Sequence, residues 1–135
     1  MRWTKEQKEW GAITLAYMLI VLTSSLMPDY NPGGSSKMKE YIFNAGHVPI
    51  YIILTFLLAS LFKVFGAKRL PIIPIVIWGA GFGILNEFVQ SFVPGRSVSL
   101  SDEGLNILGI TIMLAALRTG YIEPVHGIEA RKKHN

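Results

Sequence analysis

Apolar residues dominate four long stretches of the chain that contain no ionised side chain. The stretches are residues 10–28, 41–62, 70–86 and 104–117. A helix needs about 20 apolar residues to cross a hydrocarbon core of ~30 Å. The first two stretches meet that length directly. The third meets it only if it continues through Glu87 to Val93, and the fourth only if it begins near Leu100.

The second stretch is apolar on every side of a helix, which distinguishes it from a helix of a soluble bundle. A soluble helix carries polar residues on its outer face every third or fourth position, and residues 50–59 (IYIILTFLLA) do not. The pattern therefore predicts an all-α fold, an integral membrane bundle of four transmembrane helices.

The first stretch has one alternative interpretation, a cleaved signal peptide. Basic residues precede it, as they precede a signal sequence. However, Glu6 and Glu9 dilute that basic region, the apolar run is long, and residues 23–25 (TSS) are only a weak cleavage site. We therefore interpret this stretch as a membrane span.

Charged residues are scarce, and their placement matters more than their sum. The chain has 135 residues, of which 16% are charged, against roughly 25% in an average soluble domain. The net charge is +4 and the sequence pI is near 9.5, a balance that nucleic-acid-binding proteins also show. There is no cysteine, which excludes disulfide frameworks, cysteine zinc sites and thiol catalysis.

The basic residues lie mostly in three loops or termini that share one side of the predicted membrane. Ten of the 13 are on that side: Arg2, Lys5, Lys8, Lys63, Lys68, Arg69, Arg118, Arg131, Lys132 and Lys133. The other side has Lys37, Lys39 and Arg96. Because basic loops stay inside, both termini are predicted to be cytoplasmic in the plasma membrane. We expect no nucleic-acid partner, one membrane domain over residues 1–120 and a short, solvated cytoplasmic tail over 121–135.

Proline and glycine residues mark where the predicted helices begin, bend or approach one another. Pro71 and Pro74 suit the first turn of the third helix. Pro49, inside the second stretch, is expected to kink that helix. The Gly79-x-x-x-Gly83 spacing predicts a close helix contact, either within the bundle or in a homo-oligomer.

Three predicted helices carry polar side chains at similar depths in the outer half of the membrane. Glu87 lies seven residues before Pro94, about 10 Å below the end of its helix, and His47 lies ~9 Å past Tyr41 at 1.5 Å per residue. Asn106 is one turn beyond Asp102. Ionisable groups inside a membrane are costly and are candidates for function. The sequence therefore predicts an outward-open polar pocket, with further polar side chains just above it: Gln90, Arg96, Ser99 and Asp102.

Two kinds of chemistry fit these residues. In a binding protein, Arg96 would hold an anionic group through its planar guanidinium, Asp102 would orient it, and Gln90, Ser99 and Asn106 would line the site. In an enzyme, His47 or Glu87 would be the general base, with Asp102 as the third candidate catalytic residue. The polar residues lie only in the outer half of the predicted membrane, with no polar cluster in the inner half. They therefore do not predict the path across the membrane that a transporter needs.

Other interpretations of these residues remain, a metal site and purely structural roles. His47, Glu87 and Asp102 could together hold a metal ion, but their spacing is not diagnostic, and we expect no cofactor. His47 could be a packed neutral histidine, and Glu87 could only join helices. Arg96 and Asp102 could form an interfacial ion pair, Ser99 could cap the last helix, and Glu103 is expected to be solvated.

Residues 86–102 (NEFVQSFVPGRSVSLSD), continuing to Asn106 and Gly109, resemble the signature of VanZ-like membrane proteins. That family shows Glu-x-x-Gln, a Pro-Gly-Arg turn, a Ser, an Asp and then Asn-x-x-Gly. His47 with Tyr51 gives a second match. Many members carry an Asp-Lys pair ahead of this histidine, whereas this chain has Asn44. The resemblance covers roughly residues 12–117.

The resemblance implies a role at the cell envelope. The founding member of the family is associated with low-level resistance to the glycopeptide teicoplanin. The expected partners are therefore membrane lipids and a lipid-linked envelope precursor or glycopeptide, which the pocket would bind or modify. By the same resemblance, Asn44 and Tyr51 join the residues expected to bind this substrate.

Overall fold

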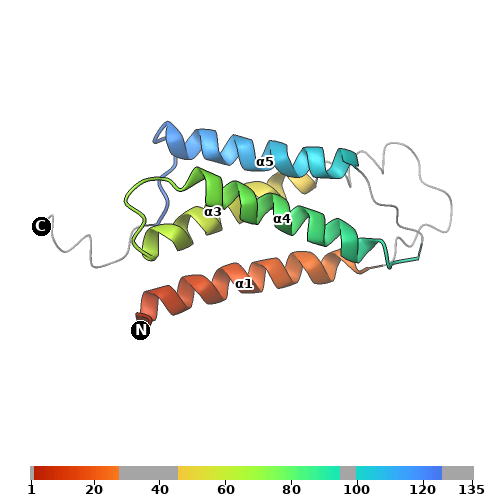
Figure 1. Cartoon of the computed structure of the whole chain (residues 1–135), viewed down its shortest axis with the longest axis horizontal. Coiled ribbons are helices and arrows are strands. Elements are labelled where there is room, and N and C mark those ends of the chain that lie inside the picture. The colour runs from red at the N-terminus through yellow and green to blue at the C-terminus, as the bar shows by residue number, and fades with distance from the viewer. Residues whose placement is uncertain (1, 28–45, 95–99, 126–135) are drawn as a thin grey trace, which may run out of the picture.

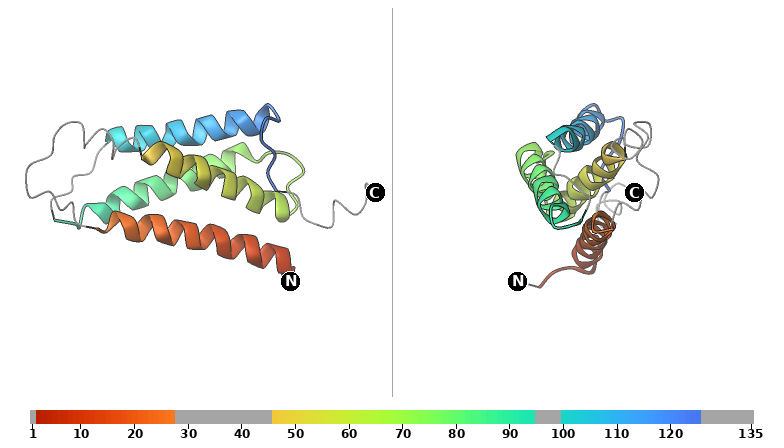
Figure 2. Two further views of the ribbon diagram at one scale, coloured as in Figure 1. Left: turned by 180° about the vertical axis from the view of Figure 1, so that it is seen from behind. Right: turned by 90° about the vertical axis from the view of Figure 1, so that its right-hand side faces the viewer.

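A computed structural model describes residues 2–27, 46–94 and 100–125, and in these ranges the chain is helical, without strands (Figure 1). The helices are α1 (Lys5–Ser25), α3 (His47–Val64), α4 (Ile72–Gln90) and α5 (Leu100–Arg118). The prediction of an all-α fold is confirmed. Successive helices run in opposite directions, so the start of α1 and the end of α5 lie at the same end of the bundle (Figures 1 and 2).

Three of the four helices form the centre of the bundle, and α1 lies beside them. The helix α3 packs most extensively against α5 and also contacts α4 and α1. The helix α1 contacts α3 and α4 but, among the described residues, not α5. Figure 2 shows this arrangement from the end of the bundle. Polar groups carried by α3, α4 and α5 can therefore meet, whereas α1 supports them from outside.

The membrane character of the helices agrees with the sequence for three of them. The helices α3, α4 and α5 are each long and apolar enough to cross a membrane. The helix α1 has 21 residues but is not among them, because it begins in a charged segment, at a capping box formed by Thr4 and Gln7. A fourth span stays a prediction.

The serine and threonine hydroxyl groups of α1 are satisfied within the helix itself, whereas the Tyr17 hydroxyl donates to the carbonyl oxygen of Ile50 on α3 at 2.9 Å. Thr14 Oγ1 donates to the carbonyl oxygen of Trp10 at 2.9 Å, and Ser25 Oγ donates to that of Leu22 at 2.7 Å. Thr23 and Ser24 bond to preceding carbonyls in the same way. Side chains that bond to their own helix do not need water, so these residues are compatible with a lipid environment.

Large apolar side chains lie on the surface of the bundle as well as in its interior. The core contains Tyr51, Leu54, Ile75 and Ile110, each almost completely buried. Large apolar side chains are also exposed on all four helices, for example Ile20, Ile53, Ile73, Trp78, Ile84 and Ile112. Soluble proteins rarely expose such continuous apolar surface, and a lipid bilayer would cover it.

Pro49 does not kink a helix, which corrects the expectation from the sequence. The helix α3 begins at His47, so Pro49 is its third residue, in the first turn where the missing N–H costs little. The predicted start of this segment at residue 41 lies outside the described residues. Pro71 and Pro74 stand at the start of α4, as predicted, with Pro71 as the N-cap.

The two glycines of α4 allow a close contact inside the chain. A Cβ atom at Gly79 would lie 2.9 Å from Ile110 Cδ1, and one at Gly83 would lie 2.9 Å from Asn106 Nδ2 and would also meet the Glu103 carboxylate. Their small size therefore lets α5 approach α4. A homo-oligomer through the same glycines stays a prediction, and it would have to use a face that α5 already covers.

A polar site at one end of the bundle

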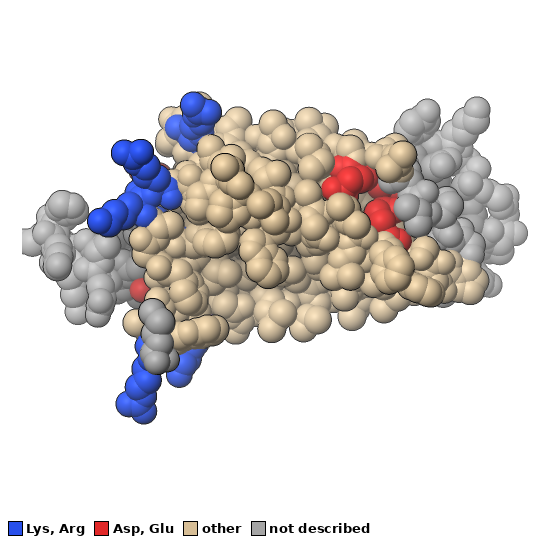
Figure 3. Space-filling model, in the orientation of Figure 1, with Lys and Arg blue, Asp and Glu red and all other residues tan. Residues whose placement is uncertain are grey.

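Charge is unevenly distributed along the bundle. In the part of the chain that the structure describes, Lys and Arg side chains gather at the end that carries the start of α1 and the end of α5 (Figure 3). Acidic side chains show at both ends, but at the end where α3 and α5 begin and α4 ends no described Lys or Arg accompanies them, so this end is acidic. The candidate functional residues belong to this acidic end.

His47, Glu87 and Asp102 converge there from three different helices. His47 is the first residue of α3, Glu87 lies in the last turn of α4, and Asp102 lies in the first turn of α5. One nitrogen or oxygen atom from each side chain can be chosen so that all three atoms lie within 4.8 Å of one another. His47 Nε2 is 4.0 Å from Asp102 Oδ2. The sequence placed Asp102 just above His47 and Glu87, and the structure brings the three side chains together.

Burial sets this group apart from an ordinary surface cluster. Glu87 is 5% exposed, and the side chains of His47 and Asp102 are 16% and 13% exposed. His47 nevertheless lies at the very start of the described helix, so its depth cannot be counted from Tyr41 as the sequence suggested. The three groups are buried between helix ends.

Asn106 is completely buried beside this group and fixes the orientation of the histidine. Asn106 Nδ2 donates to Glu103 Oε2 at 2.9 Å, and a carboxylate oxygen accepts such a bond. Asn106 Oδ1 therefore faces His47 Nδ1, also at 2.9 Å, and must accept a hydrogen bond from it. Because Nδ1 carries the hydrogen, Nε2 of the neutral ring presents a lone pair on the Asp102 side.

Glu103 belongs to this network, which corrects the expectation that it is solvated. Its side chain is half-buried, bonds Asn106 and lies against Gly83. The sequence did carry a signal for this position. Glu103 lies three residues before Asn106, on the same face of α5, and the small Gly83 leaves room for it on α4.

The remaining predicted site residues fall into two groups. Tyr51 is 1% exposed and its hydroxyl is buried without a hydrogen-bond partner, and Gln90 is 5% exposed at the end of α4. Asn44, Arg96 and Ser99 lie outside the described residues, and so does the predicted cap at Ser99. The structure therefore brings together His47, Glu87, Asp102 and Asn106.

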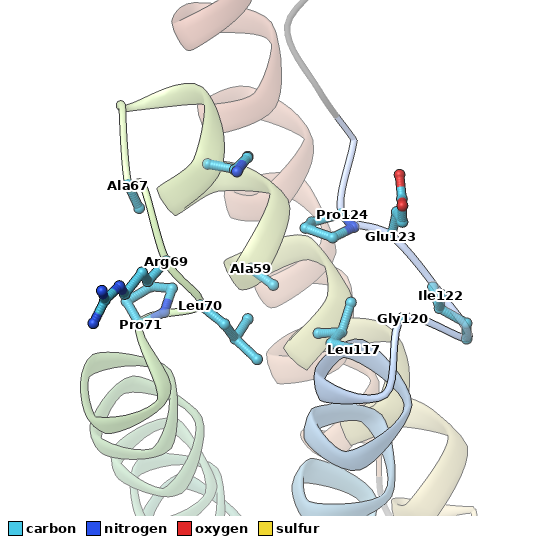
Figure 4. Close-up of a pocket in the computed structure, with 11 residues that line it drawn as sticks. Ala59, Ala67, Arg69, Leu70, Pro71, Leu117, Gly120, Ile122, Glu123 and Pro124 are labelled. Carbon is cyan, nitrogen blue, oxygen red and sulfur yellow. The ribbon is translucent and has the colours of Figure 1, made fainter.

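A cavity formed by the described residues lies elsewhere, at the basic end. Its volume is about 240 Å³, and it is bounded by the end of α3, the connection to α4, the end of α5 and residues 120–124 (Figure 4). Val125 N donates to Ser60 Oγ at 3.3 Å, and Ile122 packs on the core. The first part of the predicted solvated tail thus lies against the bundle. None of the predicted site residues lines this cavity.

These features define a small helical protein with a lipid-compatible surface and a buried acid, amide and imidazole cluster at one end. The chain belongs to the VanZ/LLP1 family, whose family model matches residues 2–121. This match covers all four helices and every residue of the polar cluster. Neither the curated proteins nor the solved structures contain a match to the chain.

Proposed function

We propose that the chain is a four-span protein of the plasma membrane that binds or modifies an anionic component of the cell envelope at its polar end. The observation that carries this proposal is the convergence of His47, Glu87 and Asp102 from three helices. Buried ionisable groups are costly in a membrane, and three of them at one level indicate a site rather than packing.

The distribution of charge supports an outward-facing site. The described Lys and Arg residues gather at the end opposite the cluster. Since basic segments stay in the cytoplasm, both termini would be cytoplasmic and the cluster would face the outer leaflet. The partners within reach are then membrane lipids and lipid-linked envelope precursors, or a glycopeptide such as teicoplanin.

Arg96 is the residue proposed to hold the anionic group. It belongs to the segment that connects α4 to α5, the two helices that contribute Glu87 and Asp102. A guanidinium binds phosphate or carboxylate through two parallel hydrogen bonds. The same proposal assigns contacts with the rest of the substrate to the remaining polar residues: Asn44, Tyr51, Gln90, Ser99 and Asn106.

A second mechanism, general acid–base catalysis by His47, is favoured by one specific contact. The hydrogen bond from Nδ1 to Asn106 holds the ring and leaves Nε2 on the side of Asp102. A histidine oriented in this way can accept a proton from a bound headgroup. Glu87 is the other candidate for this role.

The experiment compares envelope lipids and teicoplanin susceptibility in cells that lack the protein and in cells that produce it. Wild type should change the lipid or lipid-linked precursor profile measured by mass spectrometry. Arg96→Ala and Glu87→Gln should return the profile to that of cells without the protein. A Glu9→Gln variant, which makes the same charge change at the far end of the bundle, should behave as wild type.

Membrane insertion is measured in parallel, so that a missing protein is not mistaken for an inactive one. Each variant should appear in the membrane fraction at the wild-type level. Identical lipid profiles and identical susceptibility in wild-type cells and in cells without the protein would refute the proposed function. Wild-type behaviour of Arg96→Ala would refute the role given to that arginine.

A further inference from the structure

We propose that His47, Glu87 and Asp102 form a three-ligand site for a divalent transition-metal ion, with Zn²⁺ or Mn²⁺ as the ions that fit. The set combines one imidazole nitrogen with two carboxylate oxygens. Imidazole suits Zn²⁺ and carboxylate suits Mn²⁺, and both ions accept a mixed set. The inference that this ion is the cofactor of the site rests on the proposed function.

The distance between His47 and Asp102 fits shared ligation better than direct bonding. The gap of 4.0 Å between Nε2 and Oδ2 exceeds the 2.7–3.2 Å of an N–H···O hydrogen bond. Two ligands that each lie about 2.0–2.2 Å from one ion are separated by roughly 3–4 Å. The limit of 4.8 Å for all three atoms leaves only a small side-chain adjustment.

The orientation of the histidine is a second, independent sign. A ligating histidine almost always donates its other ring N–H to an oxygen that fixes the tautomer. Asn106, which is completely buried, accepts this bond from His47 Nδ1 at 2.9 Å. The lone pair of Nε2 is therefore presented on the side of Asp102, where an ion would bind.

Buried oxygen atoms near the site are available to a ligand. Asp102 Oδ1 is buried and has no hydrogen-bond partner. The Tyr51 hydroxyl, one helical turn along α3 from His47, is also buried without one. A buried polar atom without a partner is costly unless something binds it, and a coordinated ion or its water would supply the partner.

The local distribution of charge also favours a bound cation. Glu87, Asp102 and Glu103 lie at the end of the bundle where α4 ends and α5 begins. The Lys and Arg residues that the structure describes gather at the other end (Figure 3). Carboxylates this close repel an anionic substrate, whereas a divalent cation between them would attract it. Three protein ligands also leave an open coordination position, which an oxygen of an anionic headgroup would occupy.

The test measures metal binding by the full chain, purified without a histidine tag in lipid nanodiscs and stripped with a chelator. Equilibrium dialysis against ZnCl₂ or MnCl₂, followed by elemental analysis, should give about one ion per wild-type chain. His47→Gln and Asp102→Asn remove one ligand each. Their affinity should fall by at least the roughly 10- to 100-fold that loss of a supporting residue costs.

A matched control separates this site from weak binding by other histidines. The chain has three histidines, and His126→Gln should leave affinity and stoichiometry unchanged. Circular dichroism identifies any variant that does not fold. Absorption spectroscopy of Co²⁺ bound to the wild-type chain needs no variant. The absorption bands should indicate nitrogen and oxygen ligands. No saturable binding by the wild type, or equal binding by all variants, would overturn the proposal.

The metal site and the proposed function can fail separately. Binding is measured without lipid or substrate, and so does not depend on any effect on the envelope. A bound ion with unchanged envelope lipids would leave the metal site standing and refute the proposed function. Altered lipids with no metal bound would refute the metal site and favour His47 as the general base.

Discussion

Asn106 joins two ionisable side chains at the polar end of the bundle. Its amide bonds His47 on α3 and Glu103 on α5. Replacing Asn106 by Leu keeps the approximate size but removes both bonds. Polar contacts between helices contribute about 1–2 kcal/mol in membrane peptides, so we expect the free energy of unfolding to fall by about that amount, measured by denaturant titration in detergent micelles.

The control for this prediction lies on the same helix. Thr111 bonds only the carbonyl oxygen of Ile107 and is exposed. Thr111→Val should therefore change the free energy of unfolding by a few tenths of a kcal/mol at most, as surface substitutions do. Equal effects of the two substitutions would show that the Asn106 bonds contribute nothing special.

For single residues, the signal in the sequence was the energetic cost of polar groups in a membrane. His47, Glu87, Asp102 and Asn106 were identified because polar groups in apolar helices are expensive, and the structure brings them together. Glu103 was missed because it stands beside Asp102 near a helix end, where solvation is the ordinary outcome. Only the packing of α4 against α5 shows that it is covered.

At the scale of helices, Gly109 determines how closely α5 can approach α3. A Cβ atom there would lie 2.5 Å from the Val48 carbonyl oxygen and 3.0 Å from Tyr51 Cβ. Backbone cannot move aside as a flexible side chain can. Gly109→Ala should therefore destabilise the protein by about 1–3 kcal/mol, the usual cost of overpacking, in thermal unfolding monitored by circular dichroism.

A second glycine of α5 provides the comparison for this prediction. A Cβ atom at Gly104 meets nothing within 4 Å. Alanine in a helix interior is favoured over glycine by roughly 0.5–1 kcal/mol, so Gly104→Ala should stabilise the protein slightly. If Gly109→Ala did not destabilise the protein either, α3 and α5 would not be in close contact at this position.

The boundaries of the helices that the structure describes were less predictable than their presence. Pro49 was read as interior because the charge-free run begins at residue 41, but the described helix begins at His47. Absence of charge marks membrane-compatible sequence and does not mark helix ends. Likewise, α1 begins at Lys5, ahead of its apolar run, because the capping box of Thr4 and Gln7 fixes the first turn.

The whole molecule allows a direct test of orientation, because the chain contains no cysteine that would react with a labelling reagent. Single cysteines would replace Lys68, between α3 and α4, and the exposed Phe92, after α4. If the polar end faces outward, a membrane-impermeant maleimide should label Phe92→Cys in intact cells. Lys68→Cys should react only after the membrane is permeabilised.

The same reagent determines whether α1 crosses the membrane. The start of α1 lies at the same end as the end of α5 (Figure 1). Arg2→Cys should therefore be protected in intact cells, as Lys68→Cys is, because four spans bring both ends to one side. Labelling of Arg2→Cys from outside while Lys68→Cys stays protected would mean that α1 does not span the membrane. Labelling of Lys68→Cys but not Phe92→Cys in intact cells would show that the protein has the opposite orientation. The polar cluster would then lie in the cytoplasmic leaflet, out of reach of any outer-leaflet substrate.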